Sequence, residues 1–283
     1  MDIAESKNNS LLKRVIVALI FGPLIIWVFW VRGIFLYTFL VAVTSFGQWE
    51  LFRMIRGRIR FPHRLVGFVA GLLIVTDAFL GYSVHLIGII TTSLILYFII
   101  EIVSGKENKL GNVSLSMFFT VYPALLVIFI LKIDQIDNIF FGTDKRFILL
   151  FILLFVWMFD TASYFTGRFF GKRPFFPSIS PNKTMEGFWG GITGVLILGI
   201  IISFMAGKSY MFHLLVIAVL TALAGQIGDL SESIIKRELG IKDSSSIIPG
   251  HGGILDRFDS LIFAGPIVYF YLLACSLYHR GCY

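Results

Sequence analysis

Long apolar runs separated by short polar breaks fill most of the chain. The hydrocarbon core of a bilayer, about 30 Å thick, is crossed by roughly 20 apolar residues in a helix. Runs near this length lie at 15–31, 34–49, 65–82, 84–100, 113–132, 146–166, 188–206, 211–233 and 260–278. The pattern predicts an all-α polytopic membrane protein with about nine transmembrane helices. Counts of eight or ten stay open, because the second run is short and several boundaries are soft.

The first run follows a polar, basic segment at 1–14, as the apolar part of a signal peptide does. It contains Pro23, Trp27 and Trp30 and lacks a small-residue cleavage pattern, so we interpret it as a retained first span. No internal repeat is visible. We divide the chain into N-terminal transmembrane helices at 1–110, expected to form a looser subdomain, and a C-terminal catalytic region at 111–283.

Composition supports a membrane protein. Hydrophobic residues make up 57% of the chain and charged residues only 14%, with a mean hydropathy of +0.86, so ordinary soluble packing cannot bury the apolar surface. Cys275 and Cys282 lie near the C-terminus without metal-ligand spacing. They define neither a disulfide framework nor a metal site.

The net charge of +7 reports topology before it reports a nucleic-acid partner, which we do not expect. With the N-terminus cytoplasmic and the C-terminus outside, 18 of the 24 Lys and Arg residues lie on the cytoplasmic side and six outside. This orientation exposes the polar loops 167–187 and 234–259 to cytoplasmic nucleotides. The basic cluster RGRIRFPHR at 56–64 fits a lipid head-group site, although a positive-inside anchor is the stronger interpretation.

The segment GQIGDLSESIIKRELG, 225–240, predicts one polar helix face if the eighth span continues past its membrane end. That face carries a carboxylate, a hydroxyl and two cations: Asp229, Ser233, Lys236 and Arg237. An acid near the end of a span normally faces a cavity, a cation or a metal ion, because burying it alone costs several kcal/mol. A salt bridge at the helix end explains this segment equally well.

The next segment breaks the helix and favours an anion site. Glycines and Pro249 interrupt residues 240–253, and the backbone N–H groups of PGHGG can approach a phosphate closely because most of these residues lack a Cβ atom. Lys242 and His251 add charge or hydrogen bonds, and the serines at 244–246 add hydroxyl groups. Taken alone the loop is weak support, since most glycine-rich loops are turns.

Two aspartates follow in LDRFDS. Asp256 and Asp259 share a face if a helix begins there. Oxygen ligands at this spacing suit Mg²⁺, which binds one or two carboxylates together with substrate phosphates. Acidic residues also stabilise the start of a helix through its dipole. We favour a metal-assisted site for a polyanionic substrate at the cytoplasmic face of the membrane.

The loop after the sixth span adds further polar residues. Asp160, Tyr164 and Arg168 are spaced at i, i+4 and i+8, and Lys183 and Glu186 follow. An acid inside the membrane boundary is a functional hypothesis by default; pairing of Asp160 with Arg168 or a tyrosine hydroxyl is the alternative. Pairs of small residues predict close packing of the seventh and eighth helices: Gly187 and Gly191, Gly190 and Gly194, Ala224 and Gly228. Asp77, in the third span, has no constellation of polar residues near it and is left without a role.

These residues resemble a family. SIIKRELGIKDSSSIIPGHGGILDRFD, 233–259, resembles the signature of the phosphatidate cytidylyltransferases, also called CDP-diacylglycerol synthases. SPNKTMEGFWGG, 180–191, and DTASYFTGRFFG, 160–171, resemble two further stretches of that family. Asn182 departs from the pattern, in which a second lysine more often precedes Lys183. Before residue 160 the resemblance is little more than generic hydrophobicity.

The resemblance implies transfer of the cytidylyl group of CTP to phosphatidate, giving CDP-diacylglycerol and pyrophosphate for phospholipid synthesis. It also implies Mg²⁺ with a K⁺ ion sharing the site, metal ligation by Asp229, Asp256 and Asp259, and a homodimer. The enzyme is expected to be an integral membrane protein with its active site facing the cytoplasm, in the inner membrane if the source is bacterial.

We assign roles on this basis. The catalytic residues are predicted to be Asp229, Asp256, Asp259, Lys236 and Arg237. The predicted substrate-binding residues are Lys183, Arg168, Ser233, Lys242, Asp243, His251, Gly252, Gly253, Arg257, Asp160 and Glu186. Lys183 and Arg168 are assigned to the lipid phosphate, and the other cations to the triphosphate.

Two other functions were weighed. A CDP-alcohol phosphatidyltransferase has an aspartate-rich helical pattern that this sequence lacks. A transporter also carries intramembrane acids, such as Asp77 and Asp160 here, and interrupted helices. It places its polar groups near the bilayer midplane, whereas most polar groups of this sequence lie in predicted cytoplasmic loops.

Overall fold

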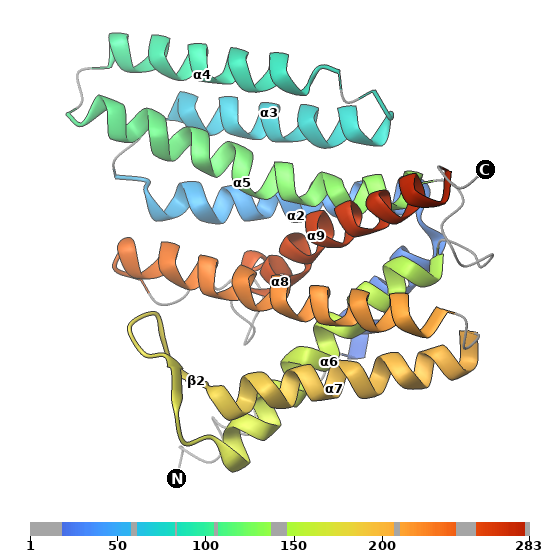
Figure 1. Ribbon diagram of the computed structural model, residues 1–283. Helices are drawn as coiled ribbons and strands as arrows, with labels where there is room; N and C mark the ends of the chain where they lie inside the picture. Colours follow the sequence, from blue (N-terminus) through green and yellow to red (C-terminus); the bar gives the residue numbers. More distant parts are fainter. Residues whose placement is uncertain are drawn as a thin grey trace. The chain divides into compact units, whose positions relative to one another are not determined.

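The computed structural model describes residues 19–57, 61–82, 84–104, 107–136, 146–206, 210–241 and 253–280. Helices dominate this part of the chain (Figure 1). They are Leu19–Val31, α2 (Gly33–Met54), α3 (Phe61–Phe79), α4 (Leu86–Val103), α5 (Lys109–Gln135), α6 (Arg146–Phe170), α7 (Met185–Ala206), α8 (Met211–Glu238) and α9 (Leu255–Arg280). Within these described ranges, seven helices are long and apolar enough to cross a membrane: α2 and α4 to α9.

Each predicted apolar run falls on one of these helices, so the all-α polytopic class is confirmed. The number of crossings and the orientation stay predictions. The loop after α6 contains one element that the hydrophobic pattern does not predict, a short antiparallel hairpin of β1 (Pro174–Phe176) and β2 (Ser180–Thr184). It precedes α7 directly.

The described residues fall into two compact units. The first takes its residues from 1–131 and 239–258, and the second from 132–238 and 259–283. The first therefore holds the helices up to most of α5 and the beginning of α9. The second holds α6, the hairpin, α7, α8 and the rest of α9.

In the first unit α2, α3 and α4 lie side by side (Figure 1). Polar side chains join these apolar helices from within. The hydroxyl oxygens of Tyr97 and Thr120 are 2.5 Å apart, and the Nε2 of Gln48 donates to the Thr120 carbonyl oxygen at 2.9 Å. Hydrogen bonds of this kind hold helices together in lipid, where apolar side chains gain little from leaving the solvent.

The second unit is built on mutual contacts of α6, α7 and α8. The predicted packing of α7 on α8 occurs near Gly199, which faces Leu215. The glycine pairs singled out for it lie elsewhere, however. Four glycines of α7 pack against α6: Gly187, Gly190, Gly191 and Gly194. Gly228 of α8 faces the backbone of Asp259. The expectation for these glycines was wrong, because small residues indicate a close approach without specifying the partner.

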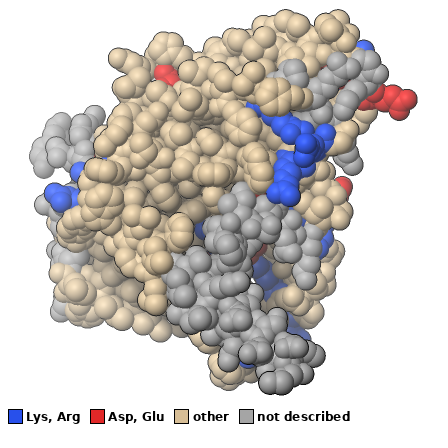
Figure 2. All heavy atoms as spheres, turned by 180° about the vertical axis from the view of Figure 1, so that it is seen from behind, with Lys and Arg blue, Asp and Glu red and all other residues tan. Residues whose placement is uncertain are grey.

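Much of the apolar surface points outward. Ile87, Ile102 and Val103 on α4 are 74–77% exposed, and the face drawn in Figure 2 is mostly uncharged wherever the chain is described. Large exposed aliphatic side chains in such numbers fit contact with lipid.

Candidate active site

The hairpin is fastened to the start of α7 by polar contacts. The carboxylate of Glu186 accepts the backbone N–H groups of Lys172 at 3.0 Å and Arg173 at 3.2 Å. The Thr184 hydroxyl accepts the N–H of Gly187 at 3.1 Å and so caps the first turn. Glu186, predicted to bind substrate, thus holds the loop in position.

Helix α6 presents the other predicted residues of this loop. The Nη1 of Arg168 donates to the Tyr164 hydroxyl at 2.9 Å, and its guanidinium lies 6.0 Å from the centre of that ring. Both side chains are exposed. Asp160, also exposed, lies close enough to Asp259 to interact with it electrostatically. Arg168 and Tyr164, the two residues considered as partners of Asp160, thus contact each other.

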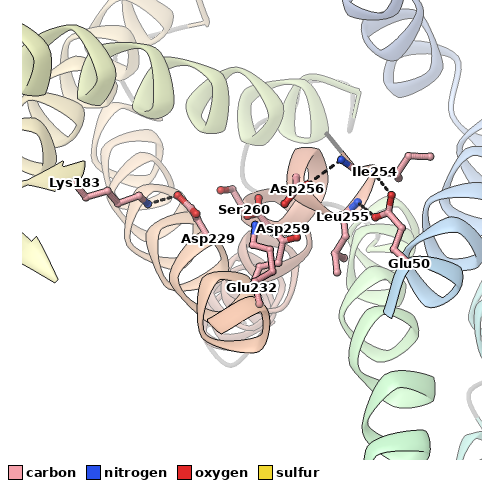
Figure 3. A network of polar contacts seen from close by, with 11 residues as sticks. Glu50, Lys183, Asp229, Glu232, Ile254, Leu255, Asp256, Asp259 and Ser260 are labelled. Carbon is pink, nitrogen blue, oxygen red and sulfur yellow. Dashed lines mark hydrogen bonds and ion pairs between the residues drawn. The ribbon is translucent and has the colours of Figure 1, made fainter. Parts of the chain in front are cut away.

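An ion pair connects the hairpin to α8. The Nζ of Lys183, at the end of β2, contacts the Oδ2 of Asp229 (Figure 3). Both side chains are partly exposed, Lys183 at 27% and Asp229 at 36%. The structure therefore brings together two stretches that the sequence places 46 residues apart.

The cations beyond Asp229 contact different partners. Helix α8 continues to Glu238 as predicted. The Nζ of Lys236 lies 3.5 Å from Glu232 one turn earlier, and the Nε of Arg237 donates to the Ile179 carbonyl oxygen of the hairpin at 3.4 Å. Ser233 is half-buried on the same helix. Gly240, whose φ of 70° is strained for other residues, follows the end of α8.

Acidic side chains gather where α8 and α9 meet. Asp259 is 6% exposed and Glu232 only 1%. Their carboxyl groups lie close together, and Asp229 and Asp160 are close enough to Asp259 to repel its charge. Gly228 makes this approach feasible, because a Cβ atom there would collide with the Asp259 carbonyl. Figure 3 shows Asp229, Glu232 and Asp259 in this region.

The oxygen donors fit a hard divalent cation. Two carboxyl groups in contact away from water require a shared proton or a cation between them. Yet among the described residues no group of three His, Cys, Asp or Glu side chains forms a ready metal site. At Asp229 the Lys183 ammonium supplies the positive charge.

The beginning of α9 belongs to the first unit, and with it Asp256. Helix α9 starts at Leu255, as the spacing of the two aspartates requires. The Oδ2 of Asp256 accepts the backbone N–H of Gly253 at 2.8 Å, within its own turn. This is the helix-start role that the sequence left as the alternative to metal binding. Arg257 follows as an exposed cation.

Glu50 of α2 holds the same turn. Its two carboxylate oxygens accept the backbone N–H groups of Ile254 and Leu255, each at 2.9 Å (Figure 3). The side chain is fully buried. Helix α2 thus fixes the start of α9, the helix that carries Asp256 and Asp259, 204 residues further along the chain.

Sequence reasoning missed Glu50 and Glu232. Glu50 lies at the edge of an apolar run, where an intramembrane acid is itself a signal. Glu232 lies three residues after Asp229 and four before Lys236, on the face already singled out. Four predicted substrate-binding residues, Lys242, Asp243, His251 and Gly252, lie outside the described residues.

Two isolated polar residues have partners. Asp77, to which the sequence analysis assigned no role, has its Oδ1 2.7 Å from the Nδ1 of His85. His213 lies 2.7 Å from the Tyr271 hydroxyl. The first pair joins α3 to the residue that precedes α4, and the second joins α8 to α9, so both have structural partners.

Comparison with known sequences identifies the family. The profile described as the cytidylyltransferase family matches residues 12–275. The chain therefore belongs to the cytidylyltransferase family. Its seven long apolar helices within the described ranges make it an integral membrane protein.

Individual relatives carry a more specific name. The phosphatidate cytidylyltransferase of Bacillus subtilis is 39% identical over 170 residues, 60% of this chain and 60% of the relative. That of Aquifex aeolicus is 37% identical over 172 residues, 60% of this chain and 61% of the relative. That of Brucella suis is 30% identical over 267 residues, 93% of each. The alignments with the first two thus span about three fifths of those proteins.

Proposed function

We propose that this protein is a phosphatidate cytidylyltransferase, which converts CTP and phosphatidate to CDP-diacylglycerol and pyrophosphate. The observation that carries the proposal is the junction of the hairpin with α8 and α9, where Lys183 pairs with Asp229 beside the buried Asp259. The relatives' names agree with this activity. CTP, phosphatidate and membrane lipid are its partners, and nucleic acid is not.

The chemistry asks little of a protein nucleophile. The phosphate monoester of phosphatidate is largely dianionic near neutral pH, since its second pKa is about 6. One of its oxygens attacks the α-phosphorus of CTP, the new P–O bond forms, and the bond to the β-phosphate breaks with pyrophosphate leaving. The protein must orient the two phosphates in line and neutralise their charge.

The chain's own cations serve this purpose. Lys183 and Arg168 are proposed to bind the lipid phosphate, and Lys236 and Arg237 the triphosphate. The contacts of Lys183 and Lys236 with carboxylates in the free protein keep these side chains close to the acids until substrate oxygens replace them. The predicted anion site is completed by further side chains and by a stretch of backbone: Lys242, Arg257, Ser233, His251 and the backbone of 250–253.

Mg²⁺ is proposed to bind Asp229 and Asp259, and Asp256 by the motif resemblance, with K⁺ nearby. When bound, the ion withdraws charge from the triphosphate. Glu232 is a further oxygen donor in contact with Asp259. The cytoplasmic orientation proposed for the site rests on the distribution of Lys and Arg, and a homodimer is proposed from the family resemblance.

The test is pyrophosphate release by detergent-purified protein given Mg²⁺ and CTP, with and without phosphatidate. Release that requires the lipid is expected, with CDP-diacylglycerol formed in equal amount. Omission of the metal should abolish it. A folded protein that releases no pyrophosphate with Mg²⁺ or Mn²⁺, or one that moves lipid without consuming CTP, would contradict the proposal.

A further inference from the structure

Three arginines line a small cavity in the first unit, at the end of α2 and the start of α3. Its volume is about 160 Å³, and its walls are Trp49, Phe52, Arg53, Arg56, Arg64 and Phe68. We call it the arginine pocket. None of these residues belongs to the predicted catalytic or substrate-binding set.

The charge of the pocket is not balanced within the described part of the chain. No described Asp or Glu forms an ion pair with Arg53, Arg56 or Arg64. The nearest acid in sequence, Glu50, accepts the backbone N–H groups of Ile254 and Leu255. Three guanidinium groups around one small cavity repel one another, and an anion would relieve that repulsion.

Arg64 offers a more specific sign of a missing partner. Its Nε is buried and finds no hydrogen-bond acceptor among the described residues. Buried donors are nearly always hydrogen-bonded, and one attached to a charged group is especially unfavourable when left without an acceptor. An oxyanion in the pocket would supply the acceptor.

The walls suit a phosphate group at a membrane surface. The guanidinium of Arg53 lies 5.1 Å from the centre of the Trp49 ring, a cation–π contact that fixes its orientation. The planar donors of arginine match the oxygen atoms of phosphate in pairs. Trp49 is 38% exposed, and tryptophan side chains concentrate at head-group depth.

The size of the cavity limits the ligand. Pockets for small molecules commonly enclose about 300–1,000 Å³, so 160 Å³ is too little for a nucleotide. It accommodates a phosphate with the rest of the molecule outside. Basic pockets between transmembrane helices on the cytoplasmic side are typical sites for anionic lipid head groups.

We propose that the arginine pocket binds the phosphate of an anionic phospholipid from the surrounding leaflet. The recognised chemistry is a phosphate group with net negative charge, which a soluble phosphate shares. The proposal does not rest on the proposed activity, because none of the pocket's residues is among those assigned to it.

Native mass spectrometry of the purified full chain tests this. Short-chain phosphatidylglycerol, short-chain phosphatidylcholine and inorganic phosphate are titrated separately, and the dissociation constant of the tightest site is compared between variants. We expect phosphatidylglycerol to bind more tightly than phosphatidylcholine, and Arg64→Gln to weaken phosphatidylglycerol about tenfold or more. Arg64→Lys should recover part of the loss, since it restores the charge without the planar donors.

Lys109→Gln is the matched control, because it removes one exposed positive charge at the start of α5 and should leave binding unchanged. If Arg64→Gln lowers the melting temperature in lipid-free detergent, Arg56→Gln, at an exposed position, makes the same comparison. Binding of inorganic phosphate with the same arginine dependence, and its competition with the lipid, would assign the site to soluble phosphate. Unchanged binding of both ligands in Arg56→Gln and Arg64→Gln would overturn the proposal.

Discussion

Buried carboxylates in the two units have opposite surroundings. In the first unit Glu101, only 2% exposed, faces two hydrogen-bond donors and a histidine. The Nε2 of His63 lies 3.0 Å away, the Ser104 hydroxyl donates at 2.8 Å, and the Asn112 amide at 3.4 Å. Glu50 likewise accepts two backbone N–H groups.

In the second unit carboxyl groups face one another. Asp259 lies close to Glu232, and the negative charges of Asp229 and Asp160 repel that of Asp259. Two cations offset them: Lys183, from the predicted substrate-binding set, and Lys236, from the predicted catalytic set. Both arrangements bury acids in helices of a membrane protein. Only the first, in which other groups donate to the carboxylate, stabilises the folded state.

The difference separates structural from functional acids. Donors around a carboxylate stabilise the fold, whereas clustered like charges oppose folding and persist where a ligand later neutralises them. Burial alone does not distinguish the two cases, since Glu101 and Glu232 are equally hidden. The groups around each carboxylate, donors or other acids, distinguish a structural acid from a functional one.

The largest effect is expected at Asp259. Asp259→Asn keeps the shape of the side chain and removes one charge from the acid cluster. We expect nucleotidyl transfer to fall at least about 100-fold, as when an electrostatic group is removed from an active site. The melting temperature should stay the same or rise, because repulsion within the cluster is relieved. Pyrophosphate release and a thermal melt in detergent measure the two effects.

Glu238→Gln is the control for Asp259→Asn. It removes one exposed negative charge from the end of the same unit's α8 and should leave both quantities unchanged. A fully active Asp259→Asn enzyme, or one that loses as much stability as we expect Glu101→Gln to lose, would remove the distinction between the two carboxylate environments.

The sequence predicted the helices well and the side-chain partners less well. Apolar length specifies a span, so the runs matched helices. The two conditions on which the shared faces depended are also met, since α8 continues to Glu238 and α9 begins at Leu255. Glu186 stays a predicted substrate-binding residue, and its carboxylate also accepts two loop N–H groups. No local pattern reports that contact, because it depends on how the hairpin folds back.

The same reason explains Glu50. The first third of the chain resembles the family only in hydrophobicity, and the bond from α2 to the start of α9 joins residues about 200 positions apart. A long-range hydrogen bond to backbone leaves no trace in the spacing of one segment. Only the presence of an acid beside an apolar run pointed to it.

Glu50→Gln sharpens the comparison from the structural side. The amide keeps one oxygen acceptor but replaces the other with a donor, so one backbone N–H at the start of α9 loses its partner. The first turn of the motif helix should then be displaced slightly, and we expect activity to fall about tenfold, since small misplacements are costly in transfer reactions. Steady-state kinetics with CTP and phosphatidate measure this.

Glu50→Asp, which keeps the charge but shortens the side chain, should also reduce activity. Recovery of full activity by Glu50→Gln would show that the charge and the second acceptor are dispensable. A loss of stability without any change in activity would place Glu50 with Glu101.

Glu101→Gln should affect stability alone. It weakens the contacts with His63, Ser104 and Asn112, and loss of a buried hydrogen bond to a charged group destabilises by about 1–3 kcal/mol. The activity of the folded protein should match wild type. Unfolding in detergent measures the free energy; Glu107→Gln, at an exposed acid near the same helices, is the control. A large loss of activity at unchanged stability would contradict the structural role.

The smallest effect compares two glycines on helices of the two units. In the second unit a Cβ atom at Gly190 of α7 would collide with the Thr166 side chain of α6, whereas Gly88 of α4 in the first unit has open space around it. Gly190→Ala should destabilise by about 1 kcal/mol, at the lower end for overpacking because a side chain can turn aside. Gly88→Ala should stabilise by about 0.5–1 kcal/mol through the better helix propensity of alanine. Equal shifts of the melting temperature for both variants would show that α6 and α7 can move apart at little cost. The glycines of α7 that face α6 would then not be needed for the packing of these two helices.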